Sequence, residues 1–194
     1  MDISSKGLTR PVKDYIHQEK VIHALYTNAD SLHNKLSELK VLIASFKHKP
    51  HIIAITEVKD KTNNNINIQE LNIPGYFIYS NSISAHSRGV ILYVDARFES
   101  SEISVDSSFN EYLVVEIKGV NNINLTVCNV YRSPNNTPDN DLKLIELINK
   151  LCRETKGDIL FLGDYHMGDI DWEFYTAPNS NILSQLLIKV LHER

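Results

Sequence analysis

Apolar runs and one helical pattern alternate along the first third of the chain. Val21 to Thr27 is a strand candidate, and Asn28 to Ser31 follows as a turn that also offers helix caps. The fully apolar run Ile52 to Ile55 comes later. Between them, apolar residues recur at helical spacing, at Leu32, Leu36, Leu39, Ile43 and Phe46. This pattern predicts a strand-helix-strand unit of ordinary length.

The middle of the chain predicts antiparallel strands. Runs rich in β-branched and aromatic residues are separated by Ser, Asn and Gly clusters at the spacing of a meander, and they cover residues 76–79, 90–94, 112–117 and 123–130. Pro74-Gly75 marks a turn before the first of these runs, and the polar stretch from Lys59 to Gln69 is predicted to be a loop.

The last third repeats the strand-helix-strand pattern. Thr137-Pro138 supplies an N-cap and a proline at the first helical position. Gly157 is expected to end this helix, residues 158–162 to form the next strand, and residues 182–191 to form a last helix. The apolar side of the first of these helices is predicted to carry Leu142, Ile145, Ile148, Leu151 and Cys152.

Paired strands between two strand-helix-strand units predict an α/β fold, in detail an α+β four-layer sandwich. Two mixed β-sheets are expected to pack face to face with the helices outside. Residues 1–19 are mixed and polar and are interpreted as a leader or linker remnant, and residues 20–194 as one domain.

Composition limits the class of protein. A chain of 194 residues with 42% hydrophobic residues can bury the core of one domain. Two cysteines are too few for a disulfide framework. No apolar stretch approaches the roughly 20 residues of a membrane span and no signal peptide is evident, so the expected location is intracellular, in cytoplasm or nucleus. A net charge of −4 argues against a broadly basic surface that coats nucleic acid, but a metal ion can neutralise phosphate locally in a nucleic-acid enzyme.

Polar side chains follow the ends of four predicted strands. Asn28 follows the first strand, Glu57 the second, Tyr131 and Arg132 the run at 125–130, and Asp164 the run at 159–162. Open α/β folds place their ligands at such strand ends. These side chains therefore predict one polar site.

The chemistry of this predicted site fits hydrolysis of a phosphate ester. Glu57 is a candidate ligand of one Mg²⁺, which needs only one or two protein carboxylates. Asp164 is placed to orient or deprotonate a water, while Asn28, Tyr131 and Arg132 hold the phosphate. Structural alternatives stay open for all five: a helix cap for Asn28, a solvated loop acid for Glu57, a strand-end aromatic for Tyr131, a surface charge for Arg132 and a turn cap for Asp164.

These motifs resemble the endonuclease/exonuclease/phosphatase superfamily, the fold of DNase I and abasic-site endonucleases, and most of all the endonuclease domain of non-LTR retrotransposons of the CR1 or jockey type. The likeness spans about residues 20 to 192. It rests on six segments: Tyr26-Thr27-Asn28-Ala29-Asp30-Ser31-Leu32 with Lys35, Glu38 and Leu39, Ile53-Ala54-Ile55-Thr56-Glu57-Val58, Pro74-Gly75-Tyr76, Arg88-Gly89-Val90-Ile91-Leu92-Tyr93-Val94, Val130-Tyr131-Arg132-Ser133-Pro134-Asn135, and Leu160-Phe161-Leu162-Gly163-Asp164 with Ile170-Asp171-Trp172.

The resemblance implies roles for these residues. The Asn matching Asn28 arranges metal and phosphate, the Glu matching Glu57 is the main metal ligand, the Tyr matching Tyr131 contacts the scissile phosphate, and the Asp matching Asp164 handles the nucleophilic water. It implies Mg²⁺, or Mn²⁺ in its place, as cofactor, with Glu57, Asn28 and Asp164 around it. It further implies DNA as substrate and a reverse transcriptase domain in the full-length element.

Two departures from the family bear on activity. His166 stands where the family has Asn; imidazole donates one hydrogen bond and can ligate a metal, yet it is bulkier, so a weakened site is expected. Family members also continue into further strands that end in a Ser-Asp-His segment, whereas this chain stops at Arg194. The expectation is a domain truncated at its C-terminus, missing its last strands and leaving two sheet edges unpaired.

Two functions therefore remain at this stage. The first is a Mg²⁺-dependent DNA endonuclease, with His166 among its catalytic residues. The second is a catalytically impaired remnant with at most weak nucleic-acid or partner binding, so whether this chain is an enzyme is left open.

Asp169 and Asp171 suggest a second metal site, but their alternation with Ile170 and Trp172 is better explained by a turn whose two apolar side chains are anchored in the core. The remaining histidines show no metal-ligand spacing.

Overall fold

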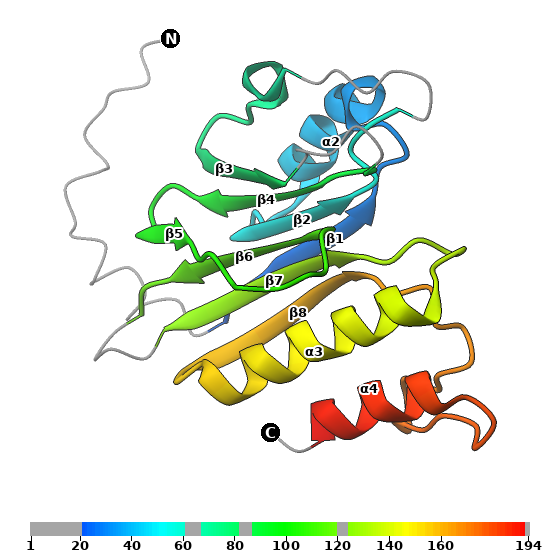
Figure 1. Cartoon of the computed structure of the whole chain (residues 1–194). Coiled ribbons are helices and arrows are strands. Elements are labelled where there is room, and N and C mark those ends of the chain that lie inside the picture. The colour runs from blue at the N-terminus through cyan, green and yellow to red at the C-terminus, as the bar shows by residue number, and fades with distance from the viewer. Residues whose placement is uncertain (1–20, 61–66, 82–86, 120–123, 193–194) are drawn as a thin grey trace, which may run out of the picture.

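The computed structural model describes residues 21–60, 67–81, 87–119 and 124–192 (Figure 1). The expected leader at residues 1–19 lies outside the described residues, and so do residues 61–66 of the predicted polar loop.

Four strands form the first sheet, in the order β1-β2-β4-β3. Their bounds are β1 Ala24–Asn28, β2 Ile52–Thr56, β3 Tyr76–Asn81 and β4 Val90–Asp95. β1 and β2 are parallel because helix α2, Leu32–Ser45, returns the chain between them, while β4 pairs antiparallel with both β2 and β3. The predicted first strand-helix-strand unit is thus confirmed.

The second sheet has the order β5-β6-β7-β8. Its strands are β5 Ser100–Glu102, β6 Tyr112–Ile117, β7 Leu125–Tyr131 and β8 Asp158–Asp164. β5, β6 and β7 pair antiparallel, whereas β7 and β8 are parallel and are connected by α3, Pro138–Glu154. Thr137 accepts the backbone N–H of Asn140 as the N-cap of α3, in agreement with the predicted start.

The two sheets pack face to face, with helices on both outer faces (Figure 1). Apolar residues of both sheets, such as Ala54, Leu92 and Val127, meet in the layer between them. The outer face of the first sheet packs against α2, and that of the second sheet packs against α3 and α4, Ile182–His192. The predicted four-layer sandwich of two mixed sheets is confirmed.

Several details differ from the sequence-based expectation. Strand β5 and the short 3₁₀ helix η1, Ile68–Leu71, were not expected from the sequence. β5 consists of three polar residues and η1 of a single turn, so neither shows a periodic hydrophobic pattern. Leu142 is exposed, and Leu144 and Leu147 are buried on α3 in addition to Ile145, Ile148 and Leu151. The helix ends at Glu154 rather than at Gly157.

Gly157 has a different structural role from the predicted one. A Cβ at this position would lie 2.0 Å from the backbone oxygen of Asn124, so only glycine allows the start of β8 to approach β7. Across the described ranges, none of the helices combines the length and apolar character needed to cross a membrane.

Candidate active site

The side chain of Asn28 joins the two sheets at the carboxyl ends of β1, β2 and β8. Its Nδ2 donates to Glu57 Oε1 at 2.8 Å and to Asp164 Oδ2 at 3.2 Å. Its Oδ1 accepts the backbone N–H of Asp30, so the amide is fixed at both ends. Because helix α2 begins with Ser31 as its N-cap, Asn28 is not the cap of that helix.

Backbone hydrogen bonds that continue past β1 and β2 hold Glu57 in place. The N–H groups of Ala29, Ser31 and Leu32 donate to the carbonyls of Thr56, Glu57 and Val58 in turn. Glu57 has φ 51°, a left-handed conformation that costs a non-glycine residue about 1–3 kcal/mol. Strain of this kind persists where the surrounding structure fixes the backbone, as it does here.

Gly163 brings Asp164 to the same site. Its φ is 130°, and a Cβ there would lie 2.0 Å from the carbonyl oxygen of Val130 on the parallel neighbour β7. In the register of β7 and β8, Tyr131 lies opposite Asp164. Gly163 is therefore required by the close packing of β8 against β7, and Asp164, directly after it, delivers the carboxylate to the site.

His166 contacts the carboxylate of Asp164. Its Nδ1 lies 2.8 Å from Asp164 Oδ1 and 2.8 Å from the carbonyl oxygen of Arg132. Both neighbours are acceptors when Asp164 is ionised, so Nδ1 carries the hydrogen and Nε2 is left for other contacts. The residue predicted to weaken the site thus takes part in orienting the predicted water-handling carboxylate.

Tyr131 is only 5% exposed, and its ring packs edge-on against that of His166, with centroids 6.0 Å apart. Burial raises the pKa of the Tyr131 hydroxyl well above its usual range, and the carboxylates of Glu57 and Glu111 add to the increase. Tyr131 therefore keeps its proton and can act as a hydrogen-bond donor toward this site.

Arg132, predicted to hold phosphate, has its guanidinium group in a network of its own. Its Nε lies 2.6 Å from Asp141 Oδ1 and its Nη2 lies 2.9 Å from Asp141 Oδ2, a bidentate pair between a largely buried arginine and a buried aspartate. Its Nη1 donates to the backbone oxygen of His166 at 2.9 Å. This arrangement fixes the loop after β8 to the start of α3.

Arg88 and Asp30 also belong to the site, and neither was predicted as a site residue. Arg88 Nη2 lies 2.6 Å from Asp30 Oδ1 and 2.6 Å from Glu57 Oε2. Arg88 Nε is buried without a hydrogen-bond partner among the described residues. Both residues lie in segments that carry the family resemblance, but a surface arginine and a turn aspartate give no separate signal in the sequence.

The donor set around Glu57 fits a small divalent cation. Two carboxylates, of Asp30 and Glu57, converge on one positively charged nitrogen, and carboxylate and carboxamide oxygens are the donors that Mg²⁺ uses. Within the described ranges, no group of three or more His, Cys, Asp or Glu residues is arranged to hold a metal ion. One or two carboxylates are sufficient for Mg²⁺ when it keeps waters and binds phosphate oxygens.

Asp169 and Asp171 lie in the loop after β8 and serve as turn residues. Asp169 accepts the hydroxyl of Ser184, and Asp171 accepts the backbone N–H groups of Glu173 and Phe174. Ile170 is buried as predicted, but the expectation that Trp172 is anchored in the core is wrong, because its side chain is 43% exposed.

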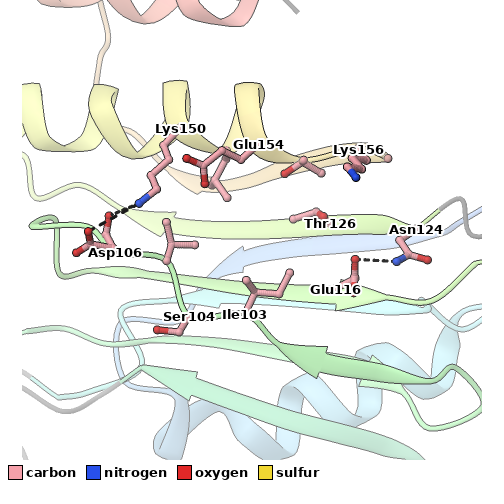
Figure 2. Close-up of a pocket in the computed structure, with 13 residues that line it drawn as sticks. Ile103, Ser104, Asp106, Glu116, Asn124, Thr126, Lys150, Glu154 and Lys156 are labelled. Carbon is pink, nitrogen blue, oxygen red and sulfur yellow. Dashed lines mark hydrogen bonds and ion pairs between the residues drawn. The ribbon is translucent and has the colours of Figure 1, made fainter.

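A separate hollow of about 600 Å³ lies between the C-terminal end of α3 and the face of β6 and β7 (Figure 2). Two of its charged groups contact protein partners: Lys150 donates to the backbone oxygen of Asp106, and Glu116 accepts from Asn124. None of the predicted site residues lines this hollow, so we assign the candidate active site to the strand ends alone.

Among known proteins, similarity to this chain was found in solved structures but not in sequence. No family model and no curated protein sequence matches the chain. Among solved structures, the endonuclease domain of TRAS1, a telomere-specific non-LTR retrotransposon, aligns with TM-score 0.59 and 14% identity over 89% of this chain and 70% of that one. The AP endonuclease LMAP from Leishmania major aligns with TM-score 0.57 and 11% identity over 89% of this chain and 65% of that one. TDP2 from C. elegans aligns with TM-score 0.51 and 13% identity over 91% and 58%.

Identities this low carry information on the fold rather than on the reaction. The three alignments cover most of this chain, and two of the three similar proteins are named as endonucleases. The order of strands, the two face-to-face sheets and these alignments agree with one another: the chain has a DNase I-like fold.

Proposed function

We propose that this chain is a divalent-metal-dependent phosphodiesterase that nicks DNA, in the manner of a non-LTR retrotransposon endonuclease. The observation that supports the proposal is the convergence of Glu57 from one sheet and Asp164 from the other on a single amide group, Asn28 Nδ2. A pair of carboxylates at one site, each held by a fixed donor, suits hydrolysis of a phosphate ester.

In this proposal Asp164 is the general base that takes a proton from the attacking water. His166 donates to one oxygen of Asp164 and Asn28 donates to the other, so the carboxylate is oriented from both sides. Tyr131, whose raised pKa keeps it protonated, donates a hydrogen bond to a phosphate oxygen. Mg²⁺, or Mn²⁺ in its place, would be held by Glu57 with Asn28 and Asp164 beside it and would stabilise negative charge on the phosphate.

A second function deserves a test because of the contacts of Glu57. Both of its carboxylate oxygens are engaged by protein groups, one by Asn28 and the other by Arg88. If the arginine holds this carboxylate too firmly for a metal ion to compete, the domain is catalytically impaired and binds nucleic acid or a partner only weakly. A reverse transcriptase domain joined to this one is part of the first proposal and not of the second.

The deciding experiment is nicking of supercoiled plasmid by the purified chain with Mg²⁺ or Mn²⁺, beside an EDTA control. Asp164→Ala should lower the nicking rate by about 10²- to 10⁴-fold, the usual effect of losing a general base. Asp158→Ala is the matched control, since this exposed acid lies at the opposite end of the same strand. His166→Asn restores the amide that the family has at this position and should retain nicking.

Absence of nicking by the parent chain and by His166→Asn, under both metals, would contradict the enzyme proposal and favour the impaired domain. Equal nicking by the parent and Asp164→Ala would assign the activity to a contaminant or to another site.

A further inference from the structure

An aromatic cleft of about 670 Å³ adjoins the candidate active site, and Asp164 and His166 line both. Half of the ten residues around it carry aromatic rings: Phe161, Tyr165, His166, Trp172 and Tyr175. The cleft is formed by the end of β8, by the loop that follows it and by the last turn of α4 at Leu191.

Two large rings of this cleft are open to solvent, while those of Phe161 and Tyr165 are partly buried against the core. Trp172 is 43% exposed and Tyr175 is 51% exposed. Contacts with other rings fix both of them, since the ring of Trp172 lies 6.0 Å from that of Tyr165 and the ring of Tyr175 lies 5.7 Å from that of His192. Tyr175 also has φ 52°, a backbone conformation that a bulky residue rarely adopts.

Charge distinguishes the cleft from the polar site beside it. Asp164 and His166, at the shared border, are the only acidic or basic residues among the ten described residues that line the cleft. Deeper in the cleft no positively charged side chain is present among these ten residues to bind a phosphate group. A flat, uncharged ring system would instead contact aromatic side chains there. Bases stack on such surfaces with little sequence preference, because every base has a π-face.

We propose that the aromatic cleft binds an unpaired nucleobase of the DNA strand whose phosphate lies at Asp164. This inference rests on the proposed function and narrows its substrate class: the strand must be single-stranded or locally unpaired next to the bond that is cut. A base stacked within a duplex cannot enter the cleft without leaving its neighbours, and that step costs least where the base is already unpaired.

Trp172 makes the proposal directly measurable, because it is the only tryptophan of the chain. Its fluorescence is titrated at low salt, in EDTA so that no cleavage occurs, with a short oligothymidylate. Two matched ligands serve as controls: an abasic spacer oligomer with the same phosphates and no bases, and a blunt duplex. We expect quenching with the oligothymidylate, and affinity at least about tenfold weaker for both controls.

A pair of variants that keep Trp172 tests the location. Tyr175→Leu should weaken binding of the oligothymidylate about tenfold. Phe77→Leu should leave it unchanged, since Phe77 is a similarly exposed aromatic on β3 in the other sheet. Circular dichroism of both variants shows whether the fold is kept, and if Tyr175→Leu unfolds, Tyr175→Phe is compared with the parent chain and should bind as tightly.

Equal quenching by the spacer oligomer would overturn the proposal, because phosphates alone would then account for binding. A fluorescence shift that grows with protein concentration in the absence of DNA would also overturn it, since a second copy of the chain would then cover the cleft. Nicking is measured separately. Quenching without nicking contradicts the proposed enzyme and retains the base site, whereas nicking without quenching contradicts the base site and retains the enzyme.

Discussion

Two arginines lie at the same end of the sandwich, one held against each sheet, and they differ in what surrounds their partners. Arg132 pairs with Asp141, and the side chains of the two are 11% and 5% exposed. Arg88 is similarly covered, at 16%, but it is shared between Glu57, at 14%, and Asp30, at 56%. The burial of the arginines is alike, and the burial of their partners is not.

The difference in partner burial indicates which of the two arginines a metal ion can replace. Asp141 is buried and accepts from Arg132 and also from Asn136, so its carboxylate is held by protein donors. Asp30 and Glu57 meet at the mouth of the candidate site, where a metal ion can approach. We therefore interpret Arg132 as a structural clamp and Arg88 as a cation whose place a divalent metal can take.

Breaking the clamp should give the largest effect. Asp141→Ala leaves the guanidinium of Arg132 buried without its partner, and the free energy of unfolding should fall by about 3–5 kcal/mol. Urea denaturation followed by circular dichroism measures it. Asp139→Ala is the control, because Asp139 is 77% exposed and pairs with Lys143 only across one turn of α3, where such pairs contribute about 0.3–0.5 kcal/mol. A loss in Asp141→Ala no greater than in this control would remove the distinction between the two arginines.

Arg88→Gln should have a smaller effect, and the effect should be on metal binding rather than on stability. Removing a positive charge 2.6 Å from Glu57 Oε2 should strengthen binding of Mn²⁺ by about tenfold, which corresponds to about 1.4 kcal/mol. Calorimetric titration with Mn²⁺ gives the affinity without any need for activity. Arg97→Gln serves as the control, since its ion pair with Asp95 involves no residue of the candidate site.

Two outcomes of that titration would count against our interpretation of Arg88. Unchanged or weaker Mn²⁺ binding by Arg88→Gln would show that the arginine supports the site rather than competing for it. If Glu57→Gln binds Mn²⁺ as tightly as the parent chain, the metal lies elsewhere and the arginine is irrelevant to it.

Most of the fold could be predicted from the sequence because the core-forming segments repeat with a clear period. The buried strands read as unbroken apolar runs, and Thr137-Pro138 marked the start of α3. Strand β5 could not be predicted, because its three residues are polar and it forms only by pairing with β6. Gly157 resembled a helix terminator, yet its role comes from the approach of β8 to Asn124, a contact between segments far apart in sequence.

The candidate site shows the same division. The polar residues after apolar runs were found, and the structure brings Asn28, Glu57, Asp164 and His166 together. The ion pairs of the two arginines could not be read from the sequence, because each joins residues whose proximity depends on packing. Arg88 meets Glu57 across the β2–β4 pairing, and Arg132, just after β7, meets Asp141 across the loop that leads into the first turn of α3.

The smallest expected effect concerns Glu111, which holds the backbone of Arg88. Its Oε1 accepts the Arg88 N–H at 2.8 Å, and burial raises the pKa of its carboxyl, although the N–H groups of Arg88 and Gly89 and the charge of Lys59 partly oppose the increase. A raised pKa means that the folded state binds this proton more tightly than the unfolded chain does. The stabilisation is full below the ordinary glutamate value of about 4.3 and is lost as the pH rises through the folded-state value.

Glu111→Gln removes this titration while keeping an oxygen that can accept from Arg88. The free energy of unfolding of the parent chain should therefore decrease relative to that of Glu111→Gln as the pH rises above about 4.3, and the difference should level off once Glu111 is ionised in both states. Denaturation of the two proteins at a series of pH values measures the difference. Parallel curves would contradict the raised pKa, because they would mean that Glu111 binds its proton equally well in the folded and unfolded states.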